Sequence, residues 1–212
     1  MRVLRGLNSP AQRPAAVTIG NFDGMHRGHQ ALLRQLKAEA ESRGLQPAVL
    51  TFAPHPREFF ARKLGEGNAP QVPARLHTLR EKLEALAAAG VAETRIGVFN
   101  EAFAALSPED FVKQVLVDAM QAKHILIGDD FRFGARRAGD FELLKSLGEQ
   151  YGFSVSALDS QCQADERISS SQVRSALATG DLQRAEALLG YPYAMEGRVI
   201  KGRQLGRTIG VP

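Results

Sequence analysis

AAVTIGNFDGMHRGH, residues 15–29, joins an apolar run to a glycine-rich turn and two histidines. The run Ala15–Ile19 predicts a buried β-strand, and a helix is expected to begin near His26 or His29. The free backbone N–H groups at the start of a helix bind anions, and glycines let a phosphate approach the backbone. The order of strand, glycine-rich turn and helix therefore predicts a phosphate site in an α/β fold.

The charges around this turn indicate the same chemistry. His26, Arg27 and His29 lie where the helix dipole is positive, which costs roughly 0.3 to 1 kcal/mol per full charge and would be reversed by a bound polyphosphate. Histidines three residues apart share one helical face and can converge on one oxyanion. The chain has no Gly-Lys pair and no G-x-G-x-x-G, which excludes a Walker loop and a standard dinucleotide fingerprint. Surface histidines on an ordinary loop are the alternative.

Short β-branched runs alternate with helical patterns along most of the chain. The expected strands are residues 15–19, 47–52, 93–99, 124–128 and 153–158, and the expected helices between them are residues 31–44, 74–90, 108–120 and 140–152. This alternation predicts an α/β fold with a doubly wound parallel sheet and helices on both faces. Ligands of such sheets bind beyond the carboxyl ends of the strands, where the strand order reverses.

The composition limits the class of protein. A chain of 212 residues, 44% of them hydrophobic, suits one substantial domain, alone or with a fragment of a second. Its net charge of +4 is compatible with anionic ligands and does not by itself indicate nucleic acid. The single cysteine, Cys162, excludes an intrachain disulfide and favours a reducing compartment. The apolar runs are too short for a membrane span and no signal-peptide pattern is present, so we expect a cytoplasmic protein.

A second polar motif, Ile168–Arg174, opens a later helical pattern. Its serines are expected to cap a helix that ends at Gly180, with Arg174 in the first turn, opposed to the dipole. Replacing Arg174 is therefore expected to weaken triphosphate binding without destabilising the empty protein. Routine serine caps and a solvated arginine are the alternative. His26-Arg27-Gly28-His29 and Ile168-Ser169-Ser170-Ser171-Gln172-Val173-Arg174 together resemble the HxGH and ISSTxxR signatures of the HxGH nucleotidylyltransferases.

Two further motifs narrow this resemblance. TFAPHPRE, residues 51–58, and GDDFRFG, residues 128–134, each follow an expected strand and so reach the ligand edge of the sheet. With the other motifs, across residues 15 to 190, they resemble the bacterial FMN adenylyltransferases, the FAD synthetase module of bifunctional riboflavin kinase/FAD synthetases. The resemblance implies a Rossmann-like sheet of the HxGH type and the transfer of AMP from ATP to FMN, giving FAD and pyrophosphate. Mg²⁺ is expected to arrive with ATP, since it binds largely through phosphates and water.

The resemblance also implies which residues form the site. His26, His29 and Arg174 would be catalytic. ATP would be bound by Gly20, Asn21, Phe22, Asp23, Gly24, Gly28, Ser169, Ser170 and Ser171, and the flavin by Phe52, Pro54, His55, Pro56, Arg57, Asp130, Phe131, Arg132 and Phe133. No metal ligand is identified, although Asp23, Asp129 and Asp130 are candidates. Residues 54–74 lack periodicity and predict a long loop, which would be a lid, a flavin-binding flap or a disordered segment.

Three other functions compete with this interpretation. Another HxGH transferase would share the phosphate motifs, but TFAPHPRE and GDDFRFG oppose it. A non-catalytic flavin or nucleotide binder would not need both His26 and His29. The basic stretch RFGARR, residues 132–137, favours nucleic acid, but no RRM, KH or zinc pattern accompanies it, so no nucleic-acid or membrane partner is expected.

The C-terminal residues are basic and rich in glycine, and they do not continue the alternation of strand and helix patterns. Residues 197–212, GRVIKGRQLGRTIGVP, resemble the first residues of the β-barrel riboflavin kinase module, whose pattern is GRxLGFPTAN. We therefore expect an adenylyltransferase domain at residues 1–187, and a linker with the truncated start of a covalently attached kinase module at residues 188–212. Since the pattern stops before its Thr-Ala-Asn, the native protein would be longer or its kinase degenerate, and no kinase activity is expected of this chain. A basic linker is the alternative.

Overall fold

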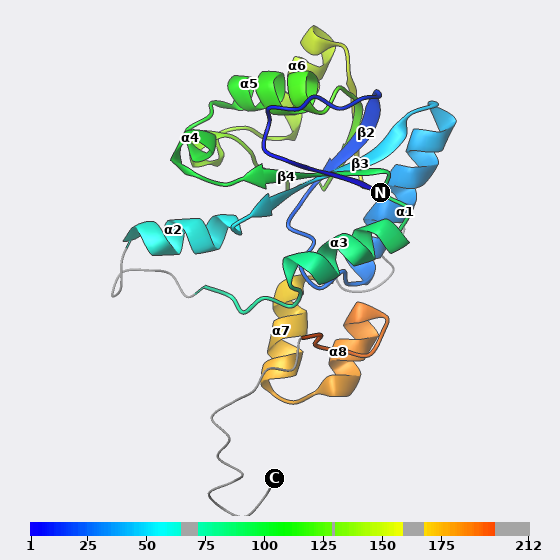
Figure 1. Cartoon of the computed structure of the whole chain (residues 1–212), viewed down its shortest axis with the longest axis vertical. Helices are drawn as coiled ribbons and strands as arrows, with labels where there is room; N and C mark the ends of the chain where they lie inside the picture. The colour runs from blue at the N-terminus through cyan, green and yellow to red at the C-terminus, as the bar shows by residue number, and fades with distance from the viewer. Residues whose placement is uncertain (65–71, 129, 159–167, 198–212) are drawn as a thin grey trace, which may run out of the picture.

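The computed structural model describes residues 1–64, 72–128, 130–158 and 168–197 (Figure 1). Its centre is a six-stranded sheet in the order β1-β4-β3-β2-β5-β6, and every pair of neighbouring strands is parallel. The strands are β1 Arg2–Arg5, β2 Ala15–Ile19, β3 Gln46–Ala53, β4 Glu93–Val98, β5 Ala122–Ile127 and β6 Ser154–Ala157. The α/β fold with a doubly wound parallel sheet is confirmed.

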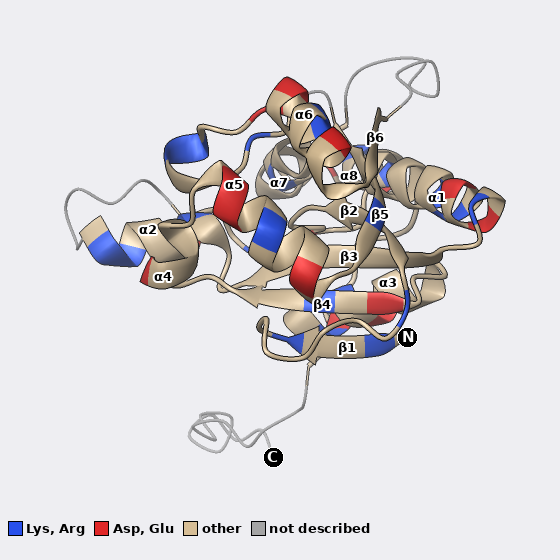
Figure 2. Cartoon of the chain, turned by 90° about the horizontal axis from the view of Figure 1, so that it is seen from above, with Lys and Arg blue, Asp and Glu red and all other residues tan. Residues whose placement is uncertain are grey.

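Helices cover both faces of this sheet (Figures 1 and 2). The helical segments are α1 Arg27–Ser42, α2 Pro56–Leu64, α3 Leu79–Ala88, α4 Glu101–Ala104, α5 Pro108–Asp110, η1 Phe111–Ala119, η2 Ala135–Arg137, α6 Phe141–Tyr151, α7 Ser170–Ala178 and α8 Leu182–Leu189. Helices α1 and α3 pack on one face, and η1 and α6 pack on the other. The segment η1 is π-helical, a local winding that the apolar pattern of residues 108–120 did not predict.

Alternation along the strands divides the core into two layers. In β2, Val17 faces the layer of η1 and α6, whereas its neighbour Ala16 faces α1 and α3. Leu50 and Val49 of β3 divide in the same way. Successive strand side chains point to opposite faces of a sheet, so a strand with helices on both sides is mainly apolar on both faces. This explains why β2 is buried at all five positions and was visible in the sequence as an unbroken apolar run.

Strand β1 was not predicted. It is short, lies at the edge of the sheet and has arginine at both ends. Arg95, fully buried on the neighbouring β4, holds the segment that follows β1 by donating hydrogen bonds to the carbonyl oxygens of Gly6 (2.8 Å), Ser9 (2.8 Å) and Ala119 (2.9 Å). The N-terminal residues are thus fixed by a side chain about 90 positions away, which a local pattern does not reveal.

The long loop expected at residues 54–74 is partly wrong, because helix α2 begins at Pro56. The proline suits the first helical position, where no backbone donor is required. The ring Nδ1 of His55 accepts a hydrogen bond from the backbone N–H of Arg57 (3.0 Å), as a capping side chain does. Phe59 and Phe60 of α2 both contact Phe99, which follows β4. These contacts attach the helix to the end of the sheet, while residues 65–71 lie outside the described part.

Helices α7 and α8 form a pair beyond the sheet (Figure 1). Val173, Leu188 and Leu189 are buried together with Leu76, which precedes α3. Helix α8 includes the expected domain boundary at residues 187/188, and that division of the chain stays a prediction. Most of the expected kinase segment, residues 198–212, lies outside the described residues.

Charged side chains lie on the helices and on β1, β4 and β5, and β2 and β3 have none (Figure 2). Among the described residues, no helix combines the length and apolar character needed to cross a membrane.

Candidate active site

A cavity of about 720 Å³ opens at the carboxyl ends of β2, β3, β4 and β5, a volume typical of small-ligand sites. Without β1, the strand order matches the 3-2-1-4-5 arrangement of doubly wound sheets, which reverses between β2 and β5. The predicted site residues that line the cavity are Gly20, Asn21, Asp23, His26, His29, Phe52, His55, Pro56, Arg57, Asp130, Phe131, Arg132, Phe133, Ser169, Ser170, Ser171 and Arg174. Motifs separated by more than a hundred residues therefore meet at the point where the strand order reverses.

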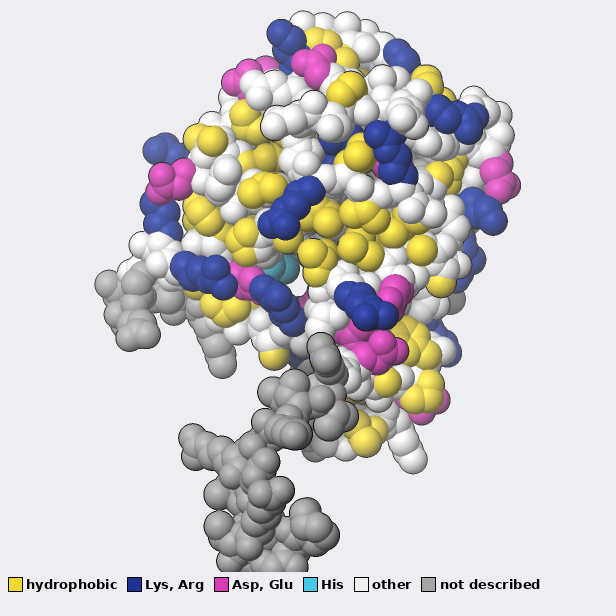
Figure 3. All heavy atoms as spheres, in the orientation of Figure 1, with side chains coloured by type: hydrophobic (Ala, Val, Ile, Leu, Met, Phe, Trp, Pro, Cys, Tyr) yellow, Lys and Arg dark blue, Asp and Glu magenta, His cyan; other side chains and the backbone are white. Residues whose placement is uncertain are grey.

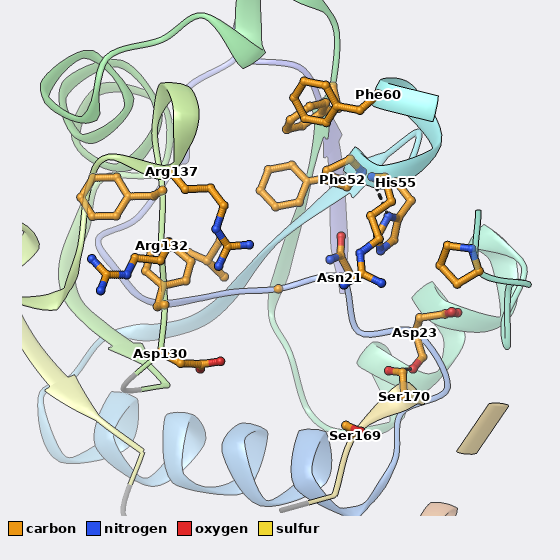
Figure 4. Close-up of a pocket in the computed structure, with 18 of the residues that line it drawn as sticks. Asn21, Asp23, Phe52, His55, Phe60, Asp130, Arg132, Arg137, Ser169 and Ser170 are labelled. Atoms are coloured by element: carbon orange, nitrogen blue, oxygen red, sulfur yellow. Dashed lines mark hydrogen bonds between the residues drawn. The ribbon is translucent and has the colours of Figure 1, made fainter. Parts of the chain in front are cut away.

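Figure 4 shows how these side chains are distributed. Asp130, Arg132 and Arg137 lie on one side of the cavity, and Asn21, Phe52 and His55 lie on the other. Ser169 and Ser170 lie near Asp23, at the end where α7 begins. The cavity thus has a hydroxyl-rich end and an aromatic, basic region.

The two histidines occupy the start of α1. Helix α1 begins at Arg27, and the ring Nδ1 of His26 accepts a hydrogen bond from the backbone N–H of His29 (3.3 Å), so His26 is the N-cap. The imidazole rings stack with their centroids 3.7 Å apart and their planes at 19°. Since the Nδ1 of neutral His26 is an acceptor, its proton is on Nε2, which is free to donate to a ligand.

Both histidines are neutral in the empty site. Burial lowers the pKa of His26 from its ordinary 6.5 to about 4, with a further contribution from the charge of Arg174. Burial, followed by the charge of His26, lowers the pKa of His29 well below its ordinary value. The dipole penalty expected from the sequence for charged histidines therefore does not arise, because neither ring is protonated at neutral pH. Each ring is a hydrogen-bond donor that can respond to an arriving anion.

Three residues expected to bind ATP shape the turn instead of lining the cavity. Phe22 is fully buried and its ring contacts His29, with 5.0 Å between the ring centroids. Gly24 has φ +82°, and a Cβ there would lie 2.6 Å from Leu76 Cδ1. A Cβ on Gly28 would lie 3.3 Å from the carbonyl oxygen of Ile168. Gly28 therefore allows the first motif to approach the second closely.

Helix α7 presents the serines of the second motif. Ser169 caps the helix through its Oγ, which accepts from the backbone N–H of Gln172, while Gln172 Oε1 accepts from the Ser169 N–H (2.8 Å). The next residue, Ser170, donates through Oγ to the carbonyl oxygen of Asp23 (2.8 Å). The predicted serine cap is confirmed, and it joins the start of α7 to the turn after β2.

Arg174 differs from its prediction. It is the fifth residue of α7, past the first turn in which it was expected. Its Nη2 donates to Asp23 Oδ2 (2.5 Å) and its Nε donates to the carbonyl oxygen of Ala74 (2.6 Å). The Asp23 carboxylate also accepts from the backbone N–H groups of Leu76 and His77. Protein donors therefore occupy both oxygens of Asp23, the first of the candidate metal ligands.

Aromatic residues make up much of the remaining wall. Phe131 and Phe133 stack with 5.6 Å between their centroids, and Phe52 contacts Phe99 and Phe103 edge to face. Phe60, Phe99, Phe103, Phe111, Arg136 and Arg137 also line the cavity and were not among the predicted site residues. The position of Phe99 directly after β4, at the ligand edge of the sheet, was the signal that could have identified it.

His55 and Pro54 lie between the large cavity and a smaller one. His55 lines both, and burial lowers its pKa. Pro54 lines only the smaller cavity.

The Arg132 guanidinium donates to Asp140 (3.1 Å), which orients the arginine along the wall of the large cavity. Within the described ranges, no group of three or more His, Cys, Asp or Glu side chains is arranged to hold a metal, and Asp129 lies outside those ranges.

A doubly wound parallel sheet with an HxGH helix start at the point of strand-order reversal, facing a serine-capped helix, has the architecture of a nucleotidylyltransferase. Sequence comparison identifies the member of this class. The FAD synthetase family model matches residues 8–172, and the chain belongs to this family. A second model, riboflavin kinase, matches residues 189–212.

The most similar relatives support the same assignment. Proteins named bifunctional riboflavin kinase/FMN adenylyltransferase match the whole chain at 46% identity in Escherichia coli K12, 45% in Haemophilus influenzae and 42% in Pseudomonas fluorescens. The chain spans 66% of the Escherichia coli protein and 67% of the Haemophilus influenzae protein. A crystal structure of a Streptococcus pneumoniae protein, described as a macrolide-efflux protein, superposes with a TM-score of 0.78 at 29% identity, over 100% of this chain and 67% of that one.

Proposed function

We propose that this chain transfers AMP from ATP to FMN, giving FAD and pyrophosphate. The observation that carries the proposal is the stacked pair His26 and His29, which lies at the reversal of strand order between an aromatic wall and the serine-capped α7. The relatives described above are about half as long again as this chain, and their names support the same reaction.

The proposed reaction is one in-line displacement. A phosphate oxygen of FMN attacks the α-phosphorus of ATP, a new P–O bond forms, and the bond between the α-phosphorus and the bridging oxygen breaks. The electron pair of that bond leaves with pyrophosphate. Because the nucleophile is already an anion, no protein base is required, and the protein contributes positioning and charge stabilisation.

His26 and His29 would act on the α-phosphate. As neutral imidazoles they add no positive charge to the empty site, and they can donate N–H groups to the oxygens on which charge develops. The ring Nδ1 of His29 is buried and has no hydrogen-bond partner among the described residues. The backbone of Gly20 and the side chain of Asn21 line the same part of the cavity.

The pyrophosphate end of ATP would lie against α7. Ser169, Ser170 and Ser171 surround the first turn of this helix, where backbone N–H groups attract anions. The Nη1 of Arg174 has no hydrogen bond to a described residue, so the guanidinium can hold Asp23 through Nη2 and a phosphate through Nη1. Mg²⁺ would arrive with ATP and be held mainly by phosphate oxygens and water.

The isoalloxazine ring of FMN would lie against the aromatic wall. Phe52, Phe131 and Phe133 offer ring faces and edges for stacking. His55, Pro56 and Arg57 would border it from the start of α2, with Asp130 and Arg132 opposite. We further propose that residues 189–212 begin a covalently attached riboflavin kinase module, and that the protein acts in the cytoplasm, because ATP is its substrate.

The direct test is incubation of the chain with FMN, Mg²⁺ and ATP radiolabelled on the α-phosphate. The label should appear in FAD, and label on the γ-phosphate should appear in pyrophosphate. Riboflavin in place of FMN should give no labelled flavin dinucleotide, since it has no phosphate nucleophile. Binding of FMN and ATP without any labelled FAD would identify the chain as a non-catalytic flavin and nucleotide binder.

A further inference from the structure

A second cavity, of about 100 Å³, lies beside the large one, between α2, α3 and the turn that contains Asp23. It shares Asp23, His55 and Arg174 with the large cavity, and Glu58, His77 and Lys82 are its own. Figure 3 shows a hollow between the surfaces of α2 and α3, with a histidine side chain visible in it and basic side chains around it. The small cavity is therefore an extension of the site, reached past the Asp23–Arg174 pair.

Lys82 is the unusual residue of this cavity. It lies on α3 with only 8% of its surface exposed, and it forms no hydrogen bond or ion pair with any residue in the described ranges. Burial lowers the pKa of its ammonium, while the nearby charge of Asp23 opposes that effect. The Lys82 Nζ keeps some accessible surface where the residue lines the cavity, and an ammonium that is largely desolvated and has no counter-ion is a candidate to meet an anion.

The carboxylates of the cavity do not supply that counter-ion. Arg75 binds both oxygens of Glu58 in a two-pronged pair at 2.6 Å each. Arg174 and two backbone N–H groups hold Asp23. With three cationic side chains and two carboxylates in its lining, the cavity carries one positive charge in excess, and that charge is at Lys82.

Two histidines line this cavity, His55 and His77, and their hydrogen bonds show which ring nitrogen of each carries the proton. The Tyr191 hydroxyl donates its proton to the carbonyl oxygen of Gly24 (2.7 Å). In its hydrogen bond with His77 Nε2 (3.2 Å) the hydroxyl must therefore be the acceptor, so His77 Nε2 carries a proton. His77 Nδ1 is then an acceptor, and it is buried without a partner in the described part of the chain. His55 is the reverse case, because its Nδ1 accepts from Arg57 and its Nε2 carries the proton. The Lys82 ammonium and the His55 Nε2–H group belong to residues that line the cavity, and two such donors suit an oxyanion.

We propose that this small cavity binds a phosphate group through Lys82. Two sources have this chemistry, namely the terminal phosphate of the ATP triphosphate, together with the pyrophosphate it becomes, and free inorganic phosphate. The first source rests on the proposed adenylyl transfer and would place Arg174, which lines both cavities, between the α-phosphate and the terminal phosphate. The second source requires no reaction.

The test replaces Lys82→Met, which removes the ammonium and keeps an unbranched apolar stem. The matched control is Lys145→Met, an exposed lysine on α6, on the far face of the sheet. Calorimetric titrations of both variants and the wild type would use inorganic phosphate, pyrophosphate, AMP, FMN and α,β-methylene-ATP, which cannot react. Lys82→Met should weaken pyrophosphate and the ATP analogue roughly 10- to 100-fold, the loss of one charge-assisted contact, and leave AMP and FMN unchanged.

Each outcome distinguishes the sources. Dependence on Lys82 for inorganic phosphate but not for the ATP analogue would assign the cavity to free phosphate. Equal binding of every phosphate ligand by Lys82→Met and wild type would overturn the proposal. If the wild type forms no FAD while phosphate binding still depends on Lys82, the proposed reaction fails and the phosphate cavity stands. Lys82→Gln, which keeps polarity without charge, provides the same comparison if the methionine variant does not fold.

Discussion

Arg174 of α7 and Asp23 of the turn after β2 form an ion pair of 2.5 Å across a separation of 151 residues. Asp23 in turn holds the segment before α3 through the backbone N–H groups of Leu76 and His77. Three stretches that are far apart in the sequence are thus joined at the one carboxylate beside the histidine pair. The residues assigned to phosphate binding are consequently also residues that hold the empty site together.

The first prediction reverses the expectation drawn from the sequence for Arg174. Arg174→Ala leaves the buried carboxylate of Asp23 without its ionic partner, and breaking such a pair typically costs roughly 3 to 5 kcal/mol. Two backbone donors remain on Asp23, so we expect a loss near the lower end, about 3 kcal/mol of unfolding free energy. Urea unfolding of the empty protein measures it. The double variant Asp23→Asn with Arg174→Ala should recover part of the loss, and an unchanged midpoint for Arg174→Ala would show that the pair is not stabilising.

The second prediction concerns His29. His29→Ala should lower the rate of FAD formation about a hundredfold, the usual effect of removing one donor from a developing oxyanion. The affinity for FMN should not change, because the aromatic wall is separate from the helix start. Single-turnover rates with FMN and ATP provide the measurement, and thermal melts provide the folding control. A wild-type rate in a folded variant would remove His29 from the reaction.

The third prediction is a pH dependence of stability. All five histidines have pKa values lowered by burial, and His26 falls from 6.5 to about 4. Between these values the unfolded chain binds the proton and the folded one does not, so stability is complete above pH 6.5 and is lost as pH falls toward 4. His26 alone accounts for roughly 3 kcal/mol. Unfolding free energies from pH 7.5 to 4.5 should fall less steeply for His26→Gln, and parallel curves would contradict the assignment.

The fourth prediction concerns the attachment of β1. Arg95→Met removes three hydrogen bonds to carbonyl oxygens and the ion pair with Glu93 (3.7 Å). Among the described residues, this leaves the buried Glu93 carboxylate with Arg2 alone as an ionic partner, at 3.8 Å. We expect a loss of about 3 kcal/mol or more, together with rapid amide exchange in residues 2–11. The control is Arg2→Met, a half-exposed partner of the same carboxylate, whose loss should be about 1 kcal/mol or less. Slow exchange of the N-terminal amides in Arg95→Met would show that other contacts hold the strand.

Local patterns were sufficient for the buried sheet and insufficient for its edges. Strands β2 and β3 are mostly apolar and β5 ends in the apolar run Ile125–Ile127, whereas the buried strand β4 carries Glu93 and Arg95 and is expected only from the alternation of strands and helices. Strand β1 depends on Arg95, and α2 depends on aromatic contacts with Phe99, so neither has a signal within its own residues. Most of the cavity lining was identified because strand ends in a doubly wound sheet converge on one edge. The Asp23–Arg174 pair was not predicted, because a contact between residues 151 positions apart leaves no periodic pattern in the sequence.

The last prediction tests whether the two motifs must touch. At Gly28 a Cβ would lie 3.2 Å from His26 Nδ1 and 3.3 Å from the carbonyl oxygen of Ile168. Gly28 lies in the first turn of α1 and its φ is outside the left-handed region, so alanine there has no backbone penalty, and helix propensity alone would favour it by roughly 1 kcal/mol. The cost of Gly28→Ala is therefore steric, because its Cβ would press on the ring of His26 and on the carbonyl oxygen of Ile168 in the segment before α7. A displacement of the order of 1 Å can cost about a hundredfold in rate. These contacts of 3.2 and 3.3 Å require a smaller shift, so FAD formation should fall by up to about tenfold while the melting temperature changes little. Gly44→Ala, at a φ of +65° with open space around its Cβ, is the reverse control, since it should lower stability and leave the rate unchanged. An active Gly28→Ala would mean that the spacing between the two motifs is not critical for transfer.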